Sequence, residues 1–238
     1  MIPFFKKKIY RLGDSMGGYR IVKLIGEGKF GICYLVTLNE KQYILKKIKA
    51  KAIKKSGNKV IFEEEILSSI NHPLIPKIVD IIKDDKVYAY ILEYKEGKTL
   101  EDMLFGCNHI FTSDEIYRIG IKLINIMKYL HERGIVHRDI RLPNVIINKD
   151  EVYLIDFGLA RWINNKKYSV SVDFSYLGHL LIYLIYSSFK KNNKKSVPWY
   201  DELDLSIEER NFLKKLIGLN DEYTNIYEVE KDFLKIKT

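Results

Sequence analysis

A glycine-rich segment early in the chain has residue types and spacing that suit phosphate binding. Gly26–Gly31 reads G-E-G-K-F-G. Glycines have no Cβ, so backbone N–H groups there can approach phosphate oxygens closely. The same spacing opens dinucleotide-binding folds, where a helix should follow, but here the β-rich stretch Ile32–Leu38 follows. On this segment alone, a phosphate-binding hairpin and a glycine turn without a ligand remain equally open.

A lysine inside an apolar β-type run is the second candidate. Lys46 ends the sequence Y-I-L-K, and a lysine in such a place is costly to desolvate unless it is paired. The helix expected next carries three consecutive glutamates. Glu63 is the natural partner, and Glu64 and Glu65 are alternatives. An ordinary solvated lysine is the plain alternative for Lys46, and it is our interpretation of the neighbouring Lys47.

Two further strings complete a recognisable series. His137–Asn144 reads H-R-D-I-R-L-P-N and Asp156–Gly158 reads D-F-G. With the glycine loop, the strand lysine and the helix glutamate, these strings occur in a fixed order over residues 19–180. In this the chain resembles the eukaryotic-like protein kinase superfamily, and in particular small bacterial serine/threonine protein kinases.

The resemblance implies an ATP- and Mg²⁺-dependent phosphotransferase. A γ-phosphoryl group in transfer carries charge spread over its oxygens, so catalysis consists mostly of positioning and electrostatic stabilisation. By resemblance, Lys46 holds the α- and β-phosphates and Glu63 fixes Lys46. Asp139 accepts the proton of the acceptor hydroxyl. Asn144 and Asp156 supply the hard oxygen ligands that suit Mg²⁺.

The same resemblance assigns the remaining nucleotide contacts. His72-Pro73, nine residues beyond the helix glutamate, selects Glu63 over its neighbours. Glu93 and Lys95 fall in the hinge, and Cys33 stands where the family usually has valine over the nucleotide. The residues expected to bind the nucleotide are Ile25, Gly26, Gly28, Gly31, Cys33, Lys46, Glu63, Glu93 and Lys95.

The chain departs from the family pattern at three places. Ile44 replaces the usual small residue two positions before the strand lysine, where we expect it to narrow the adenine pocket. Arg141 stands where serine/threonine kinases usually have lysine. Because arginine also binds phosphate, we expect Arg141 to act in transfer. Asp173 follows Asp156 by only 17 residues, and no A-P-E element lies between them. The segment that normally cradles a substrate peptide is therefore shortened or absent, which makes control by an activation loop improbable.

Patterning predicts an α+β fold with a β-rich lobe and a helical lobe, and the resemblance implies that this fold is of the bilobal protein-kinase-like type. We expect a single protein kinase domain over residues 1–238, with an N-lobe at about 19–94, a hinge at 93–97 and a mainly helical C-lobe at 98–238. The N-lobe is predicted to hold a five-stranded antiparallel sheet and one helix, Lys59–Ile70, in which apolar residues recur every four positions. The predicted strands are Tyr19–Gly26, Ile32–Leu38, Gln42–Ile48, Ile78–Ile82 and Val87–Glu93.

The second half of the chain carries clear helix signals. Thr112–Glu115 and Ser206–Glu209 are capping boxes, each followed by a helical pattern. The first of these helices should end near Gly134. Val145–Ile147 and Val152–Ile155 predict a hairpin, and Asp173–Tyr186 predicts a deeply buried helix whose Asp173 braces the catalytic loop.

Composition limits the class of protein. The chain has 238 residues, a formal net charge of +9 and two cysteines, which is enough for a core and argues against a disulfide scaffold. No apolar run reaches the length of a membrane span. The start of the chain lacks the order of a signal peptide, so we expect a cytoplasmic protein.

Four functions compete at this stage. The first is a kinase acting on serine or threonine of proteins, including itself, and the second is a kinase of the same fold with a small-molecule acceptor. A nucleotide-binding scaffold is disfavoured because Lys46, Asp139, Asn144 and Asp156 are all present. Specific nucleic-acid binding has only the net charge in its favour. The acceptor's identity and the oligomeric state are left open.

Overall fold

The computed structural model describes residues 10–49, 61–83, 87–164, 167–190 and 197–236. The chain divides into two compact units, one ending at Lys95 and the other beginning at Glu96. We call them the N-terminal and the C-terminal unit and describe each by itself. The division falls inside the predicted hinge.

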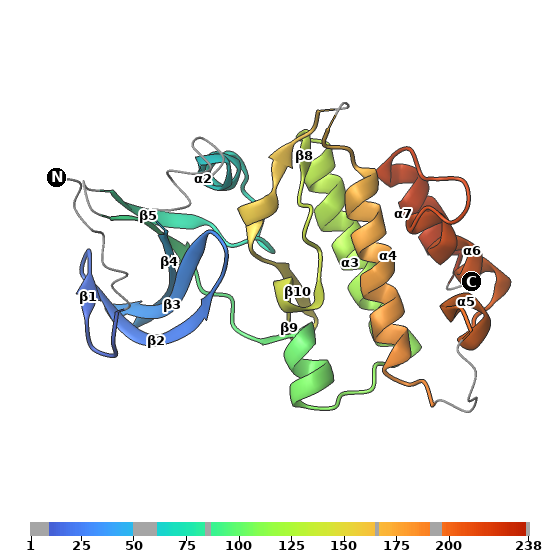
Figure 1. Cartoon of the computed structure of the whole chain (residues 1–238), viewed down its shortest axis with the longest axis horizontal. Coiled ribbons are helices and arrows are strands. Elements are labelled where there is room, and N and C mark those ends of the chain that lie inside the picture. Colours follow the sequence, from blue (N-terminus) through green and yellow to red (C-terminus); the bar gives the residue numbers. More distant parts are fainter. Residues whose placement is uncertain (1–9, 50–60, 84–86, 165–166, 191–196, 237–238) are drawn as a thin grey trace. The chain divides into compact units, whose positions relative to one another are not determined.

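The N-terminal unit is built on one antiparallel sheet (Figure 1). Its strands follow the order β1-β2-β3-β4-β6-β5. The bounds are Ser15–Met16 for β1, Tyr19–Glu27 for β2, Gly31–Leu38 for β3, Lys41–Ile48 for β4, Ile78–Lys83 for β5 and Tyr88–Glu93 for β6.

The prediction of five strands is wrong by one short strand. Gly17 and Gly18 both adopt positive φ, at 57° and 84°, and so turn the chain back on itself. Ser15 and Met16 therefore pair with the beginning of β2. A two-residue strand has no periodicity of its own, so the pattern could not reveal it.

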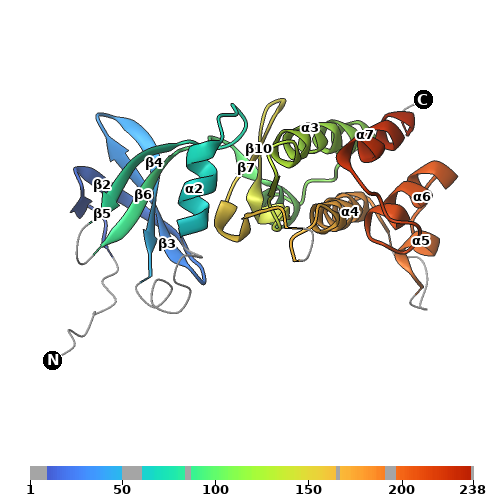
Figure 2. The ribbon, with the colours of Figure 1, turned by 90° about the horizontal axis from the view of Figure 1, so that it is seen from above.

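Helix α2 (Ile61–Ser69) lies against one face of this sheet (Figure 2). Residues 59 and 60 of the predicted helix lie outside the described residues. Apolar side chains from the strands of this sheet form a core, which includes the wholly buried Tyr34, Val36, Leu45 and Ile91. Ile66 and Leu67 of α2 are buried as well, at 0% and 3% exposure, so this helix is packed into the unit through its apolar side.

The C-terminal unit is mainly helical. Helices α3 (Ser113–His131) and α4 (Ser171–Tyr186) lie side by side in both views (Figures 1 and 2). Helices α5 (Trp199–Glu202), α6 (Ile207–Leu216) and α7 (Ile226–Lys235) complete this unit, with α7 packing on α3 and α6 on α4. Both predicted capping boxes are confirmed, at Thr112 with Glu115 and at Ser206 with Glu209.

Short strands and turns frame the loops that carry the candidate residues. β9 (Val145–Asn148) and β10 (Glu151–Leu154) form the predicted hairpin, and β7 (Lys98–Thr99) adds to its edge. β8 (Ile135–Val136) pairs with β11 (Arg161–Trp162). Three single turns complete the set: η2 (Asp102–Gly106), η3 (Leu142–Asn144) and η4 (Phe157–Leu159). None of the helices in the described ranges is both long and apolar enough to span a membrane.

Candidate active site

In the N-terminal unit, Lys46 on β4 pairs with Glu63 on α2. The Lys46 Nζ lies 2.6 Å from Glu63 Oε1 and 2.9 Å from Oε2. Both residues are buried, at 7% and 3% exposure, so each charge depends on the other for compensation. The open choice among three glutamates is settled by geometry, because Glu64 accepts a hydrogen bond from Tyr88 and Glu65 is exposed.

Strand register adds two neighbours to Lys46. Cys33 on β3 stands directly opposite it on one side and Tyr90 on β6 on the other. The Lys46 Nζ lies 6.0 Å from the centre of the Tyr90 ring, within range of a cation–π contact. Tyr90 was not predicted as a site residue, since the continuous apolar run of β6 does not show which of its side chains lies opposite Lys46.

The glycine loop is the tight turn between β2 and β3. The Gly28 N–H donates to the Gly31 carbonyl at 2.9 Å. A Cβ at Gly31 would lie 2.8 Å from the Lys47 carbonyl, so this glycine is required for the strands to pack. A Cβ at Gly26 or Gly28 would meet nothing within 4 Å. The first two glycines therefore border open space, which backbone approach to a ligand needs.

Lys49 holds this loop in a way that the sequence did not suggest. Its Nζ donates to the Gly28 carbonyl at 2.6 Å and lies 2.8 Å from the Glu27 carboxylate. Its backbone N–H also donates to the Phe30 carbonyl. The loop is thus anchored to the end of β4, three residues after Lys46.

The predicted hinge residues lie together at the end of β6. Lys95 pairs with Glu93 at 3.0 Å, and the Lys77 N–H donates to the same carboxylate. Burial alone would raise the pKa of Glu93, but these hydrogen bonds outweigh it and the pKa lies below its ordinary value. Ile25, predicted to contact the nucleotide, is half exposed on β2.

In the C-terminal unit, the carboxylate of Asp139 is held from two sides. Arg141 approaches with its Nε 2.5 Å from Oδ1 and its Nη2 2.9 Å from Oδ2. Asn144 donates from Nδ2 to Oδ2 at 2.8 Å and to the Asp139 carbonyl at 2.9 Å. Asp139 is only 6% exposed, so its orientation is tightly defined. The hydrogen bond with Asp139 raises the pKa of Arg141, more than burial lowers it.

Asp173 on α4 braces the loop that carries Asp139. Its wholly buried carboxylate accepts from the N–H groups of His137 at 2.9 Å and of Arg138 at 2.6 Å, and lies 2.9 Å from His131 Nε2. Arg138 has a φ of 65°, a conformation that needs such support in a residue other than glycine. The structural role predicted for Asp173 agrees with these contacts.

His137 is part of the scaffold beneath the loop. It is wholly buried, packs edge-to-face on Phe157, and its Nδ1 accepts from the Asp139 N–H at 3.3 Å. Burial lowers the pKa of His137, which keeps the imidazole neutral and its Nδ1 able to accept. The expectation of a structural rather than a proton-carrying histidine fits this environment.

Asn144 and Asp156 are brought near each other by the backbone. The N–H of Ile155 donates to the Asn144 carbonyl at 2.9 Å, and Asp156 is the next residue. Asp156 adopts a φ of 60°. The Asn144 amide nitrogen donates to Asp139, so the Asn144 side-chain oxygen is the atom that could serve as a metal ligand. In the described part of the chain, no three His, Cys, Asp or Glu side chains converge on a metal site. Two oxygen donors suit Mg²⁺, which takes its other ligands from phosphates and water.

The described parts of the short segment from Asp156 to Asp173 are held by contacts to the rest of the unit and by one bridge within the segment. After η4, β11 pairs with β8, and Asn164 bridges to Tyr168. The guanidinium of Arg138 donates to the Leu159 carbonyl at 3.1 Å and lies 4.5 Å from the centre of the Tyr168 ring. The segment lacks an A-P-E element, and in this structure Tyr168 contacts the loop residue Arg138. The sequence did not predict this contact.

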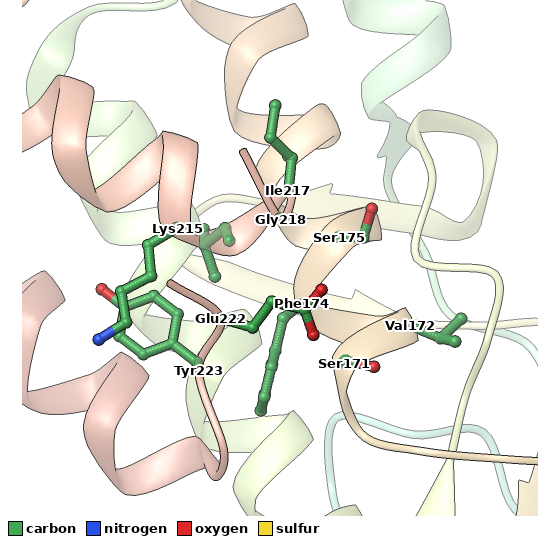
Figure 3. Close-up of a pocket in the computed structure, with 10 residues that line it drawn as sticks. Ser171, Val172, Phe174, Ser175, Lys215, Ile217, Gly218, Glu222 and Tyr223 are labelled. Atoms are coloured by element: carbon green, nitrogen blue, oxygen red, sulfur yellow. The ribbon is translucent and has the colours of Figure 1, made fainter. Parts of the chain in front are cut away.

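A cavity of about 230 Å³ lies between the start of α4 and the α6–α7 connection (Figure 3). Ser171 and Ser175 on α4 and the Glu222 carboxylate line it, and Phe174 forms part of its wall. It contains none of the candidate site residues, and we assign it no part in the chemistry.

A strand lysine held by a helix glutamate and a loop carboxylate held by an arginine and an asparagine are the parts of a phosphotransferase of the kinase type. Comparison with known proteins agrees. A family profile described as the protein kinase domain matches residues 19–215. The chain therefore belongs to the protein kinase family, and it is an ATP-dependent phosphotransferase acting on hydroxyl groups of proteins.

The chain covers different shares of the length of its individual relatives. A probable serine/threonine-protein kinase YbdM of Bacillus subtilis is 38% identical over 224 residues, covering 90% of this chain and 87% of that protein. A probable serine/threonine-protein kinase KIN1 homolog of Enterocytozoon bieneusi is 31% identical, covering 67% of this chain and 27% of that protein. The serine/threonine-protein kinase OXI1 of Arabidopsis thaliana is 34% identical, covering 59% and 36%. The chain thus spans most of the bacterial relative and a minor part of the two eukaryotic ones.

Proposed function

We propose that the protein transfers the γ-phosphoryl group of ATP to serine or threonine side chains of proteins, its own included. The bacterial relative that shares most of its length with this chain is described as a serine/threonine kinase, which supports this choice of acceptor. The observation that carries the proposal is the buried Asp139 carboxylate, held by Arg141 and Asn144 on a loop braced by Asp173.

In the proposed reaction, the acceptor oxygen attacks the γ-phosphorus and its proton passes to Asp139. The bond between the γ-phosphorus and the β–γ bridging oxygen breaks, and ADP leaves. Lys46, oriented by Glu63, carries a positive charge for the α- and β-phosphates. Arg141, which pairs with Asp139 in the structure, has the charge and fork geometry to bind the γ-phosphoryl oxygens as well.

The residues expected to hold Mg²⁺ are Asn144 and Asp156. The ion, when bound with ATP, would neutralise charge on the phosphates. Asn144 also has a second task in this chain, because its amide nitrogen orients Asp139. Asp156 is presented on a backbone turn in which its own carboxylate accepts from the Gly158 N–H at 3.3 Å.

The neighbouring lysines of β4 provide the test. Lys46→Met should lower the rate of phosphate transfer from γ-labelled ATP by about 10²–10³-fold, as expected for loss of a charge-stabilising donor. Lys47→Met is the matched control. It changes the adjacent residue, whose Nζ lies over the Tyr10 ring instead, and should keep near-normal activity.

Phosphoamino-acid analysis of the labelled acceptor identifies the product. We expect phosphoserine or phosphothreonine on a generic protein acceptor or on the enzyme. Label found solely on tyrosine, or solely on an added small molecule, would contradict the proposed acceptor. Equal loss in both lysine variants would contradict the assigned role of Lys46.

A further inference from the structure

Lys49, directly after β4, contacts three neighbouring points of the turn between β2 and β3. Its Nζ donates to the Gly28 carbonyl at 2.6 Å and lies 2.8 Å from Oε1 of Glu27. Its backbone N–H donates to the Phe30 carbonyl at 2.9 Å. One residue therefore ties both the backbone and the acidic side chain of the turn to the end of β4.

These contacts add little to the stability of the fold. The side chains of Lys49 and Glu27 are 27% and 31% exposed. An ion pair at that exposure is weakened by water and salt, and holding two long side chains together costs entropy. Gly28 is exposed, so water can replace the lysine as the donor to its carbonyl. The main consequence of the ion pair is therefore the charge that it gives to the turn.

The turn carries a carboxylate at the place where phosphates are expected. Glu27 stands between Gly26 and Gly28, and both glycines border open space, since a Cβ at either would meet nothing within 4 Å. Nucleotide phosphates are negatively charged, and an unpaired carboxylate repels them over about 8–10 Å at ordinary salt concentrations. The Lys49 ammonium, in contact with the carboxylate, cancels most of this repulsion.

The Gly28 carbonyl makes a smaller contribution of the same sign. Its oxygen would also repel a phosphate, and Lys49 directs it to a donor within the protein. A carbonyl oxygen has only a partial charge, however, whereas the Glu27 carboxylate has a full one. The ion pair is therefore the larger of the two effects on a bound phosphate.

We propose that Lys49 is a positioning residue for the nucleotide phosphates, which acts by holding and neutralising Glu27 and not by touching the phosphates. This inference rests on the proposed function and adds to it a residue that sets the affinity for the phosphate groups. In that function Lys46 supplies a positive charge for the phosphates, whereas Lys49 removes a negative one.

ADP and adenosine test the inference, because they share the base and the sugar and differ in the phosphates. Their dissociation constants are measured on the whole protein by titration calorimetry, with Mg²⁺ and about 0.1 M salt. In Lys49→Met, ADP should bind about three- to tenfold more weakly, as expected for one uncompensated charge several ångströms away. Adenosine should bind within about twofold of its affinity for the unaltered protein, since it has no phosphate to repel.

A second substitution separates neutralisation from direct contact. Glu27→Gln combined with Lys49→Met removes both charges of the pair. ADP affinity should then return to within about twofold of the unaltered protein, because the net charge of the turn is restored.

Lys41→Met is the matched control. It removes the same charge from an exposed lysine at the other end of β4, which is eight residues and about 26 Å away at about 3.3 Å per residue. At that distance the charge is screened, so ADP affinity should stay within about twofold.

Three results would overturn the inference while leaving the proposed function standing. The first is a loss of ADP affinity below about threefold in Lys49→Met. The second is a loss that Glu27→Gln does not restore, which would mean that Lys49 touches the phosphates itself. The third is an equal loss for ADP and adenosine, which would mean that Lys49 only maintains the fold of the turn. Absence of both ADP binding and phosphate transfer in the unaltered protein would instead contradict the proposed function.

Discussion

Asp173→Asn is the substitution that tests most sharply how the catalytic loop is held. The change keeps the size of the side chain but replaces one carboxylate oxygen by an amide that donates. One of the two loop N–H groups, from His137 or Arg138, then loses its acceptor inside a wholly buried site. An unsatisfied buried donor costs about 1–3 kcal/mol, and the remaining bond loses its charge-assisted strength, about 1 kcal/mol more. We therefore expect a loss of about 2–4 kcal/mol in the free energy of unfolding.

Tryptophan fluorescence is the natural assay for this loss. The chain has two tryptophans, Trp162 on β11 and Trp199 on α5, and both lie in the C-terminal unit with Asp173. Their signal therefore reports unfolding of the unit that contains the substitution. For a protein of this size, the expected loss corresponds to a fall in Tm of about 4–16 °C.

Asp150→Asn is the control for this experiment, because Asp150 is an exposed residue in the β9–β10 turn. It should leave Tm within about 1 °C, as surface substitutions usually do. A Tm for Asp173→Asn that matches the control would refute the reasoning, since it would mean that the loop does not depend on the buried carboxylate.

Two further outcomes concern the surroundings of the loop. Because the pKa of buried His137 is lowered, the unfolded chain takes up a proton near pH 6.5 that the folded chain does not. Stability should therefore be complete above that pH and fall below it, by at most about 1.4 kcal/mol per pH unit. The free energy of unfolding can be measured with urea at pH 7.5, 6.5 and 5.5. Its dependence on pH should be reduced in His137→Phe and retained in the control His179→Phe, which changes an exposed histidine. Equal pH dependence in the two variants would contradict the role given to His137. Because Arg138 already contacts the Leu159 carbonyl and the Tyr168 ring, activity should stay within about twofold after phosphatase treatment, whereas a tenfold drop would show that the segment needs phosphate.

Much of the framework could be predicted from local signals. The long strands are runs rich in β-branched, aromatic and other apolar residues. The capping boxes at Thr112 and Ser206 mark helix starts because each satisfies backbone donors locally. The candidate residues of the C-terminal unit were predicted from their order along the chain. That Asp139, Asn144 and Arg141 form one hydrogen-bonded group is a geometric fact that their order alone does not contain.

Other features depend on contacts that are distant in sequence. The two-residue strands β8 and β11 exist because Ile135 and Trp162 come together, and neither segment has a pattern of its own. The stacking of Arg138 on Tyr168 arises in the same way. Helix α7 was missed although a signal was present. Asn225 caps it with two backbone hydrogen bonds, and its apolar residues recur at helical spacing.

The most direct test of the central claim is the rate of a single phosphoryl transfer in Asp139→Asn. The asparagine keeps the size of the side chain and its acceptor oxygen but cannot take the proton of the acceptor hydroxyl. With ATP and Mg²⁺ saturating, measured by rapid quench, the rate should fall by about 10²–10⁴-fold. ATP affinity should change by no more than about threefold, because Asp139 is proposed to act on the acceptor and not on the nucleotide. A transfer rate within about tenfold of the unaltered protein would contradict the proposal that Asp139 is the proton acceptor.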